Sequence, residues 1–427
     1  MKKFFFLFVT ISFSSLLQAQ VKLNDELKNL MKQSFVFFPK IKEVENAEIT
    51  AQEKLNLIEL NKNPQFDVSA SYNFVMPKIS FPINGREIQF APTSNVATSI
   101  GGVYPMYDFG RLKTNIDKAK VDLSFSKHTT AASKIQLAYQ VANIYYTIIY
   151  FQKALAIQDS VLLYFNENKK IIDKKIMSGE ALKIDALNLQ ANIDAEENKK
   201  IDLLSLIQKQ LNLLNYTTGI NKISGKEFDS IIESLNIDDA LASFQKNNPE
   251  FQLANDKVLL SKKEIDIIQL NKKPNLNIHG AAGIKNGYVP SVNEVRFNYL
   301  AGISFSLPID AFGKTKQQVK LQQSIVTQNQ LFQASILSNN KKDIEQTLLD
   351  IDVNNKKIKN TESQIKSAKS ALDLTSSRYH NGVATYLDII SAAANVEKAS
   401  LTKLQSEYQL CISTLELARL MGDECWN

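Results

Sequence analysis

Glycine and proline are scarce in this sequence, with 14 Gly and 10 Pro among 427 residues, and they are unevenly distributed. Neither residue occurs between Arg111 and Met177 or between Lys314 and Asn381. Each of these tracts has about 67 residues, which as an α-helix would measure on the order of 100 Å. A globular domain rarely holds helices this long, so the tracts predict long helices that pack side by side as coiled coils.

Cysteine and net charge are also low. The two cysteines are Cys411 and Cys425, and on one helix they would lie about 21 Å apart, too far to form a disulfide. The formal net charge is only +6, and no basic block with interleaved aromatic residues is present. These features exclude a disulfide framework and argue against a nucleic-acid partner.

Residues suited to catalysis or metal binding are sparse. The three histidines, His128, His279 and His380, are scattered, and no nucleophile, phosphate-binding loop or metal-spaced cluster accompanies them. We therefore predict that the protein is not an enzyme and that it requires no cofactor or metal.

Beyond the N-terminus, no apolar run approaches the roughly 20 residues needed for a spanning helix. Residues 1–19 have the features of a secretory signal peptide, although a short membrane anchor is an alternative. Lys2 and Lys3 begin it, an apolar stretch runs from Phe4 to Leu17, and Ala19 ends a small-residue cleavage site. No cysteine follows that site, so export without a lipid anchor is expected.

The sequence contains an internal duplication. At an offset of 203 residues the matched pairs are Pro105 and Pro308, Gly110 and Gly313, Gly179 and Gly382, Asp185 and Asp388, and Gly219 and Gly422. Upstream the offset is 210, which pairs Pro39 with Pro249 and Pro64 with Pro274. The chain is therefore predicted to contain two copies of one structural unit, at residues 20–219 and 237–427, joined by a linker at 220–236. The change of offset places a seven-residue insertion in the first copy, between Pro64 and Pro105.

Apolar spacing supports helices in both copies. Ile135, Ala138, Ala142, Tyr145 and Ile149 step by three and four residues, which is the heptad pattern of a coiled-coil seam. Glycines 179 and 382 are expected to end long helices at 111–178 and 314–381. Shorter helices should follow at 181–216 and 384–420, and one further helix is expected in each of the segments 24–61 and 238–272.

Between the helical tracts the apolar period changes to two, which predicts a β-hairpin at 66–104 and another at 275–307. Phe66, Val68 and Tyr72 alternate with small or polar residues, and Phe297 to Leu307 does the same. Such alternation suits strands with lipid on one side and water on the other, or a soluble antiparallel sheet over a core. Residues 76–93 carry three prolines and a glycine, so we expect a long loop there, and its insertion suggests that the hairpin tips face the exterior.

Four strands cannot close a barrel, and an open sheet edge in lipid leaves backbone groups unpaired at a cost of several kcal/mol each. A membrane-spanning form would therefore need several copies of the chain. Two copies supply eight strands around a filled interior, and three supply twelve strands around a channel.

The combined pattern resembles TolC-type outer-membrane factors of bacterial efflux and secretion systems. The resemblance rests on Asn248-Pro249, on Phe-Gly following each of Pro105 and Pro308, and on Arg378-Tyr379-x-x-Gly382 with Asp388. It spans nearly all of the mature chain. It implies a homotrimer whose twelve-stranded barrel lies in the outer membrane and continues into a helical barrel in the periplasm, with short helices stacked end to end beside the long ones.

The resemblance also implies site residues. The turns at Gly179 and Gly382 would form the periplasmic tip, where an adaptor docks and the tunnel closes. Asp185 and Asp388 would narrow the pore as carboxylate rings that favour cations, although each also suits a helix N-terminus. Tyr379, next to Arg378, could donate a hydrogen bond to Asp185. The strand-to-helix junctions would lie at Pro105, Gly110, Pro308 and Gly313.

Two positions depart from the family pattern. Ala384 and Ser391 stand where the family often has a basic and an acidic residue, so a thinner closing network is expected.

We therefore predict a mainly helical protein with a transmembrane β part. It would act as the passive outer-membrane channel of a tripartite efflux or type I secretion system, alongside a periplasmic adaptor and an inner-membrane pump. The alternative is an exported coiled-coil scaffold with a small soluble sheet. A periplasmic binding module is a more distant third, because no pocket is evident in the sequence.

Overall fold

The computed structural model describes residues 23–83, 86–229 and 236–426. The predicted signal peptide, 1–19, lies outside the described residues. Contacts divide the chain into two compact units, each built from both sequence repeats. Within the described residues, no helix combines the length and the apolar character required to cross a membrane.

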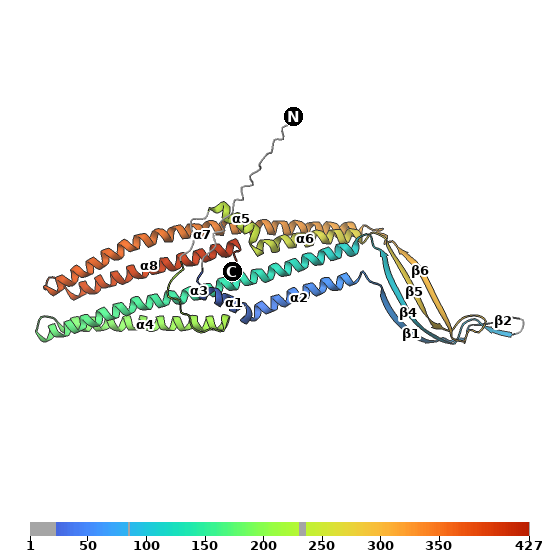
Figure 1. Ribbon diagram of the computed structural model, residues 1–427, viewed down its shortest axis with the longest axis horizontal. Coiled ribbons are helices and arrows are strands. Elements are labelled where there is room, and N and C mark those ends of the chain that lie inside the picture. The colour runs from blue at the N-terminus through green and yellow to red at the C-terminus, as the bar shows by residue number, and fades with distance from the viewer. Residues whose placement is uncertain (1–22, 84–85, 230–235, 427) are drawn as a thin grey trace, which may run out of the picture. The chain divides into compact units, whose positions relative to one another are not determined.

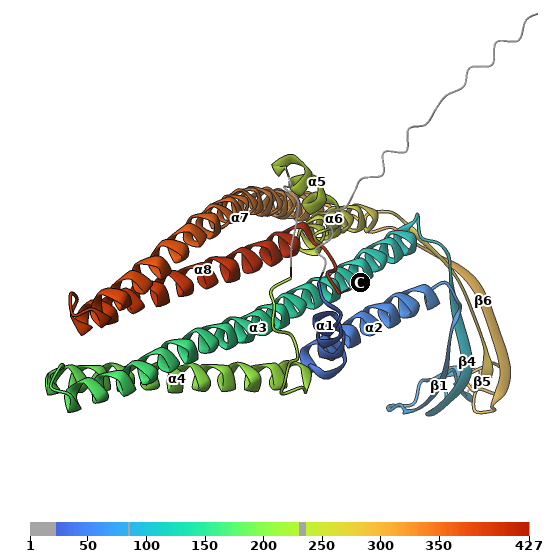
Figure 2. The same ribbon diagram turned by 60° about the vertical axis from the view of Figure 1, so that its left-hand side comes forward.

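The first unit is helical. It contains α1 (Asp25–Phe37), α4 (Lys183–Thr218), α5 (Ile237–Asn247) and α8 (Tyr386–Met421), together with the later parts of α3 (Arg111–Met177) and α7 (Lys314–His380). Figures 1 and 2 show α4 running back beside α3, and α8 running back beside α7. The predicted seam on α3 is buried, since Ala142, Tyr145 and Ile149 each have 0% exposure. These residues pack against α1 and α8 in the largest apolar cluster of the unit.

The second unit contains the four-stranded sheet and the helices that lead into it. Its helices are α2 (Pro39–Leu60), α6 (Pro249–Leu270) and the first parts of α3 and α7. Leu55 on α2 packs against Ile116 and Ala119 on α3. Lys118 on α3 pairs with Glu264 on α6 at 2.7 Å, and Gln322 on α7 donates to the Ser261 carbonyl of α6.

The sheet is antiparallel, with the order β1 (Gln65–Phe74), β4 (Ser94–Tyr107), β5 (Asn275–Lys285) and β6 (Arg296–Ser306). The two repeats therefore meet where β4 pairs with β5, which the curved sheet in Figure 2 shows. β1 and β6 each have one edge without a partner strand within the described chain.

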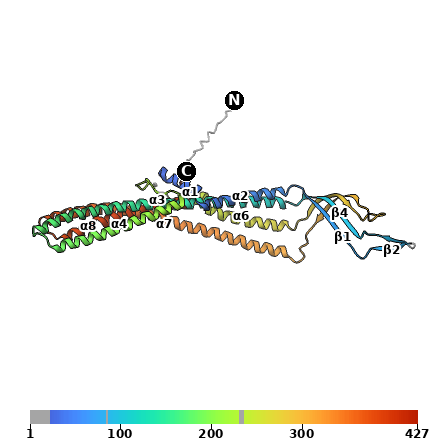
Figure 3. The same cartoon turned by 90° about the horizontal axis from the view of Figure 1, so that it is seen from below.

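Two predicted single helices are in fact pairs. Segment 24–61 divides into α1 and α2 between Phe38 and Pro39, and segment 238–272 divides into α5 and α6 between Asn248 and Pro249. The cause is the proline, which restricts the preceding residue to extended backbone and suits the first position of a new helix. Phe38 and Asn248 accordingly have ψ near 120°. Figure 3 shows α1 and α2 as separate segments.

The predicted loop at 76–93 was also wrong in part, because it contains a small hairpin of β2 (Ser80–Ile83) and β3 (Arg86–Gln89). In Figure 1, β2 extends past the ends of the main strands. Because Phe81 pairs with Ile88, one side of this hairpin carries four apolar side chains, those of Ile79, Phe81, Ile88 and Phe90. Four-residue strands are too short for an alternating pattern to stand out in sequence.

Candidate functional site

The long helix α3 ends, in the turn before α4, at a glycine in the left-handed conformation. Gly179 has φ +80°, its amide donates to the Ile176 carbonyl, and the Glu180 amide donates to the Lys175 carbonyl. This is the Schellman pattern, in which glycine avoids the steric penalty of a side chain at positive φ. No atom lies within 4 Å of a Cβ placed at Gly179, so backbone conformation rather than space requires glycine.

The turn between α7 and α8 repeats this arrangement. Gly382 has φ +75°, its amide donates to the Tyr379 carbonyl, and the Val383 amide donates to the carbonyl of exposed Arg378. The helix ends predicted at Gly179 and Gly382 are thus confirmed.

Asp185 and Asp388 begin the returning helices as capping carboxylates. Asp185 Oδ2 accepts from the Leu182 amide at 3.2 Å. Asp388 Oδ2 accepts from both the amide and the hydroxyl of Thr385, at 2.8 Å each. The hydrogen bonds from Thr385 lower the pKa of the Asp388 carboxyl, with a smaller contribution from Arg378. Asp388 is therefore ionised at neutral pH and open to solvent.

Tyr379 lies between the two turns. It is 9% exposed and belongs to an apolar cluster with Tyr386, Leu189 and Phe165, so the cluster joins both helical hairpins. The Tyr379 ring lies 5.8 Å from the Tyr386 ring and 4.5 Å from the Lys175 ammonium. Burial, followed by the charge of Asp185, raises the pKa of the Tyr379 hydroxyl.

The predicted hydrogen bond from Tyr379 to Asp185 does not form within this chain. The hydroxyls of Tyr379 and Tyr386 are both buried and have no hydrogen-bond partner among the described residues. The Asp185 carboxylate turns instead to the Leu182 amide, because the exposed start of α4 has no side-chain cap of its own. Besides the apolar cluster, a contact with the Lys175 ammonium links Tyr379 to the first repeat, and sequence reasoning missed it.

Farther from the turns, a charged group joins the two helical hairpins. Lys199 on α4 lies 2.9 Å from Glu196 and 3.1 Å from Glu397 on α8, and both carboxylates are nearly buried. Gln158 on α3 donates to Glu196 at 2.6 Å. Desolvation lowers the pKa of Lys199, but hydrogen bonds to Glu196 and Glu397 outweigh it, so the net shift is upward.

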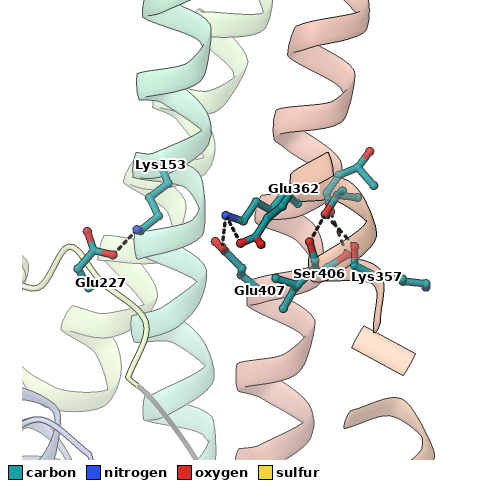
Figure 4. Close-up of polar contacts among 10 residues, drawn as sticks. Lys153, Glu227, Lys357, Glu362, Ser406 and Glu407 are labelled. Carbon is teal, nitrogen blue, oxygen red and sulfur yellow. Dashed lines mark hydrogen bonds and ion pairs between the residues drawn. The ribbon is translucent and has the colours of Figure 1, made fainter. Parts of the chain in front are cut away.

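A second cluster of charged residues links α7 to α8. Lys403 on α8 lies 3.0 Å from Glu362 on α7 and 3.5 Å from Glu407. Figure 4 shows Glu362 and Glu407 facing each other, and Lys153 reaching Glu227 on the neighbouring segment. No sequence pattern marks the contacts of Lys403 with Glu362 and of Lys153 with Glu227, because these partners are distant along the chain.

The segment between the repeats, predicted as a linker at 220–236, is bound to α1 and α3 over its described part. The Glu26 carboxylate accepts from the amides of Ser224 at 2.6 Å and Gly225 at 2.8 Å, and from the Tyr145 hydroxyl at 3.0 Å. Asp229 accepts from the Asn24 amide at 3.0 Å. These contacts hold the segment across the middle of α3.

The strand-to-helix junctions use aspartate caps and left-handed glycines. Gly110 and Gly313 have φ +89° and +71°. Asp108 accepts from the Gly110 and Leu112 amides, and Asp310 accepts from the Thr315 amide. Pro308 lies in the connection before α7, but Pro105 lies inside β4 rather than ending it. The register shifts between Pro105 and Tyr107, because proline cannot donate to the ladder and is accommodated at an irregularity.

The main sheet has one apolar face across all four strands. The cross-strand register aligns Val68 with Ile100, Ile100 with Ala282, and Ala282 with Tyr299. The same face carries aromatic residues near the helix side (Phe66, Tyr104, Phe305) and near the loop side (Tyr72, Phe74, Phe297, Tyr299). Most of these side chains are more than half exposed. The opposite face carries serine, asparagine and the charged residues.

Comparison with known proteins assigns this combination of long helical hairpins and a sheet with one apolar face to a family. The family described as "Outer membrane efflux protein" matches residues 38–219 and again residues 240–423. The chain belongs to the outer membrane efflux protein family. This assignment confirms the resemblance seen in the sequence, and it identifies the chain as an outer-membrane protein of a family of efflux channels.

A curated relative and solved structures agree with the family. Nodulation protein T of Rhizobium leguminosarum bv. trifolii is 21% identical over 345 residues, covering 76% of this chain and 72% of that protein. A membrane protein from Pseudomonas aeruginosa matches with TM-score 0.81 at 16% identity, over 95% of this chain and 92% of that one. The Campylobacter jejuni CmeC outer membrane channel matches with TM-score 0.79 at 15% identity, over 96% and 90%. At these identities, the structures show that the efflux-channel fold is shared.

Proposed function

We propose that the protein is the passive outer-membrane channel of a tripartite exporter, assembled as a homotrimer with a periplasmic adaptor and an inner-membrane pump. The observation that carries the proposal is the single apolar sheet face, with a central band of small and aliphatic residues between two aromatic bands. Transmembrane barrels have this arrangement, because aromatic rings favour the two membrane interfaces and aliphatic side chains favour the hydrocarbon. A soluble sheet would cover such a face with a core.

The unpaired edges of β1 and β6 support assembly from several copies. In lipid, each unpaired backbone group costs several kcal/mol, so pairing β1 of one copy with β6 of the next removes the cost. Three copies give twelve strands and a polar lumen lined by the opposite face of the sheet.

The helical turns are proposed as the adaptor-binding tip. Asp388 projects an ionised carboxylate, and the Tyr379 cluster joins the two hairpins behind it. In a trimer, the Asp185 and Asp388 carboxylates would form rings at this end and favour cations. The helical part would then lie in the periplasm.

The experiment that tests the proposal is single-channel recording of the detergent-purified protein in a planar bilayer, with its oligomer sized by light scattering. We expect discrete current steps from a trimer. A monomer that stays in solution without detergent and produces no steps would overturn the proposal and favour an exported scaffold.

A further inference from the structure

The four main strands carry few charged side chains, and all of them lie on the polar face. Asp67 on β1 is near the helix side of the sheet, whereas Lys285 on β5 and Arg296 on β6 are at the loop side. β4 carries no charged residue. The formal charge of this face therefore changes from negative to positive along the strands.

Lys285 and Arg296 are direct cross-strand partners. Like charges placed opposite each other weaken a sheet by up to about 1 kcal/mol relative to a neutral pair. The chain nevertheless places both cations at one register position, on the face opposite Ile284 and Phe297.

The surroundings hold Lys285 and the end of β5 in place. The Lys285 ammonium lies 5.1 Å from the centre of the Tyr288 ring, and the Tyr288 hydroxyl accepts from Asn298 at 2.9 Å. Asn286, the next residue, accepts from the Val96 amide at 2.9 Å and donates to the Ser94 carbonyl at 2.6 Å, which fixes the end of β5 against β4.

The positive charge is only partly compensated. Arg296 lies 3.1 Å from Glu294, whose side chain is 65% exposed and therefore well screened by water. Within the described ranges, Lys285 has no carboxylate within ion-pair distance. Its neighbours on the same face are Ala97 and Arg296.

We propose that Lys285 and Arg296 form a cationic ring at the outer end of the lumen, which attracts small anionic solutes at that end, whereas the Asp185 and Asp388 rings proposed at the tip favour cations. The inference rests on the proposed trimeric channel, in which three copies would place six cations around the opening, three of them paired with Glu294. Rings of Lys and Arg are the usual basis of anion selection in pores. Anionic lipid headgroups would approach from the apolar face, so the ring faces solutes in the lumen.

The test compares the potassium-to-chloride permeability ratio, from reversal potentials across a KCl gradient, for three forms of the protein. These are the natural protein, a neutral variant with Lys285→Gln and Arg296→Gln, and a charge-conserving variant with Lys285→Arg and Arg296→Lys. Near 0.1 M salt the neutral variant should raise this ratio about twofold or more, while the charge-conserving variant should leave it unchanged. Near 1 M salt the difference should vanish, because screening then extends over only about 3 Å.

The outcomes separate this inference from the channel itself. Equal ratios for the natural and neutral proteins at low salt, with normal current steps in both, would overturn the cationic ring and leave the channel standing. A ratio that changes equally in the charge-conserving variant would also overturn it, since shape rather than charge would then be responsible. Absence of steps from the natural protein would overturn the proposed function, and the ring with it.

Discussion

The ammonium group of Lys175 on α3 lies 4.5 Å from the centre of the Tyr379 ring on α7. The two residues belong to different repeats and stand beside the two glycine turns. Their contact links the hairpin of α3 and α4 to that of α7 and α8. At this point the buried Tyr379 hydroxyl makes no hydrogen bond within the described part of the chain. The polar link between the two hairpins at this point therefore depends on the Tyr379 ring and the Lys175 ammonium rather than on the Tyr379 hydroxyl.

Replacing Lys175 tests the cation. Lys175→Met keeps most of the apolar side chain but removes the charge, so we expect a loss of about 1 kcal/mol in unfolding free energy. Lys175→Arg keeps a cation over the ring and should behave like the natural protein. Urea unfolding of the detergent-purified protein measures the difference, and equal loss in both variants would contradict a cation–π role.

Replacing Tyr379 tests the hydroxyl. Because the hydroxyl is buried without a partner, Tyr379→Phe should be neutral or stabilise the fold by about 1 kcal/mol. Tyr379→Phe alone should conduct no better in bilayers than the natural protein, because it removes no hydrogen bond to Asp185. Higher conductance for Tyr379→Phe, with no further rise when Asp185→Ala is added, would show that the hydroxyl bonds Asp185 once the protein is assembled.

The long helices and the strand faces could be predicted because their signals are local. Helix length follows from a tract without Gly or Pro, and strand orientation follows from the period of two along Phe66 to Phe74. Both signals lie in consecutive residues. The divisions at Pro39 and Pro249 were also within reach, since proline restricts its predecessor whatever the tertiary structure. Both prolines mark the repeats, and each also begins a new helix.

The contacts of the site could not be predicted in the same way. Lys175 with Tyr379, and Lys199 with Glu397, join residues of different repeats that no local pattern connects. Asp185 and Tyr379 were expected to bond because both flank the turns. The competing partner was the exposed Leu182 amide at the start of α4, which becomes evident only when the helix end is fixed.

The cap of α8 should make its stability depend on pH. Hydrogen bonds from Thr385 lower the folded pKa of Asp388 below its ordinary value, so this contribution is fully present at neutral pH and is lost as pH falls through the folded pKa. Asp388→Asn should therefore lower the melting temperature more at pH 7 than at pH 3.

Thr385→Ala removes the hydroxyl half of the same cap and should cost about 1 kcal/mol at pH 7. Thr402→Ala is a matched control, because its hydroxyl donates to the Lys398 carbonyl within the helix and caps no helix end. Melting curves recorded by circular dichroism at both pH values measure these effects. A deficit for Asp388→Asn that is the same at pH 3 would contradict a carboxylate cap.

The segment between the repeats requires glycine at position 225. A Cβ there would lie 1.9 Å from the Tyr145 hydroxyl oxygen and 3.2 Å from Glu26 Oε2. Gly225→Ala should destabilise the fold by about 1–3 kcal/mol, and adding Tyr145→Phe should restore part of the loss. Gly280→Ala is the control, since its nearest neighbour is 3.6 Å away. Absence of rescue in thermal unfolding would show that the clash is not with the hydroxyl.

The two faces of the sheet can be compared at adjacent residues. Val68 and Ser69 are both exposed in β1 and point to opposite faces. Val68 lies in the aliphatic band, and the Ser69 hydroxyl lies 3.0 Å from the Ser99 hydroxyl. If the apolar face meets hydrocarbon, Val68→Arg should cost about 2–4 kcal/mol near the bilayer midplane. Ser69→Arg, which adds the same charge on the lumen side, should cost much less. Refolding into lipid vesicles from urea measures both, with folded protein followed by its resistance to protease.

A soluble sheet would tolerate arginine at Val68 as well as at Ser69, because water would solvate both, so equal stability of the two variants would remove the membrane assignment of this face. A large loss at Val68 alone would locate the hydrocarbon against β1 and would require the aromatic residues on either side of it to lie at the two interfaces.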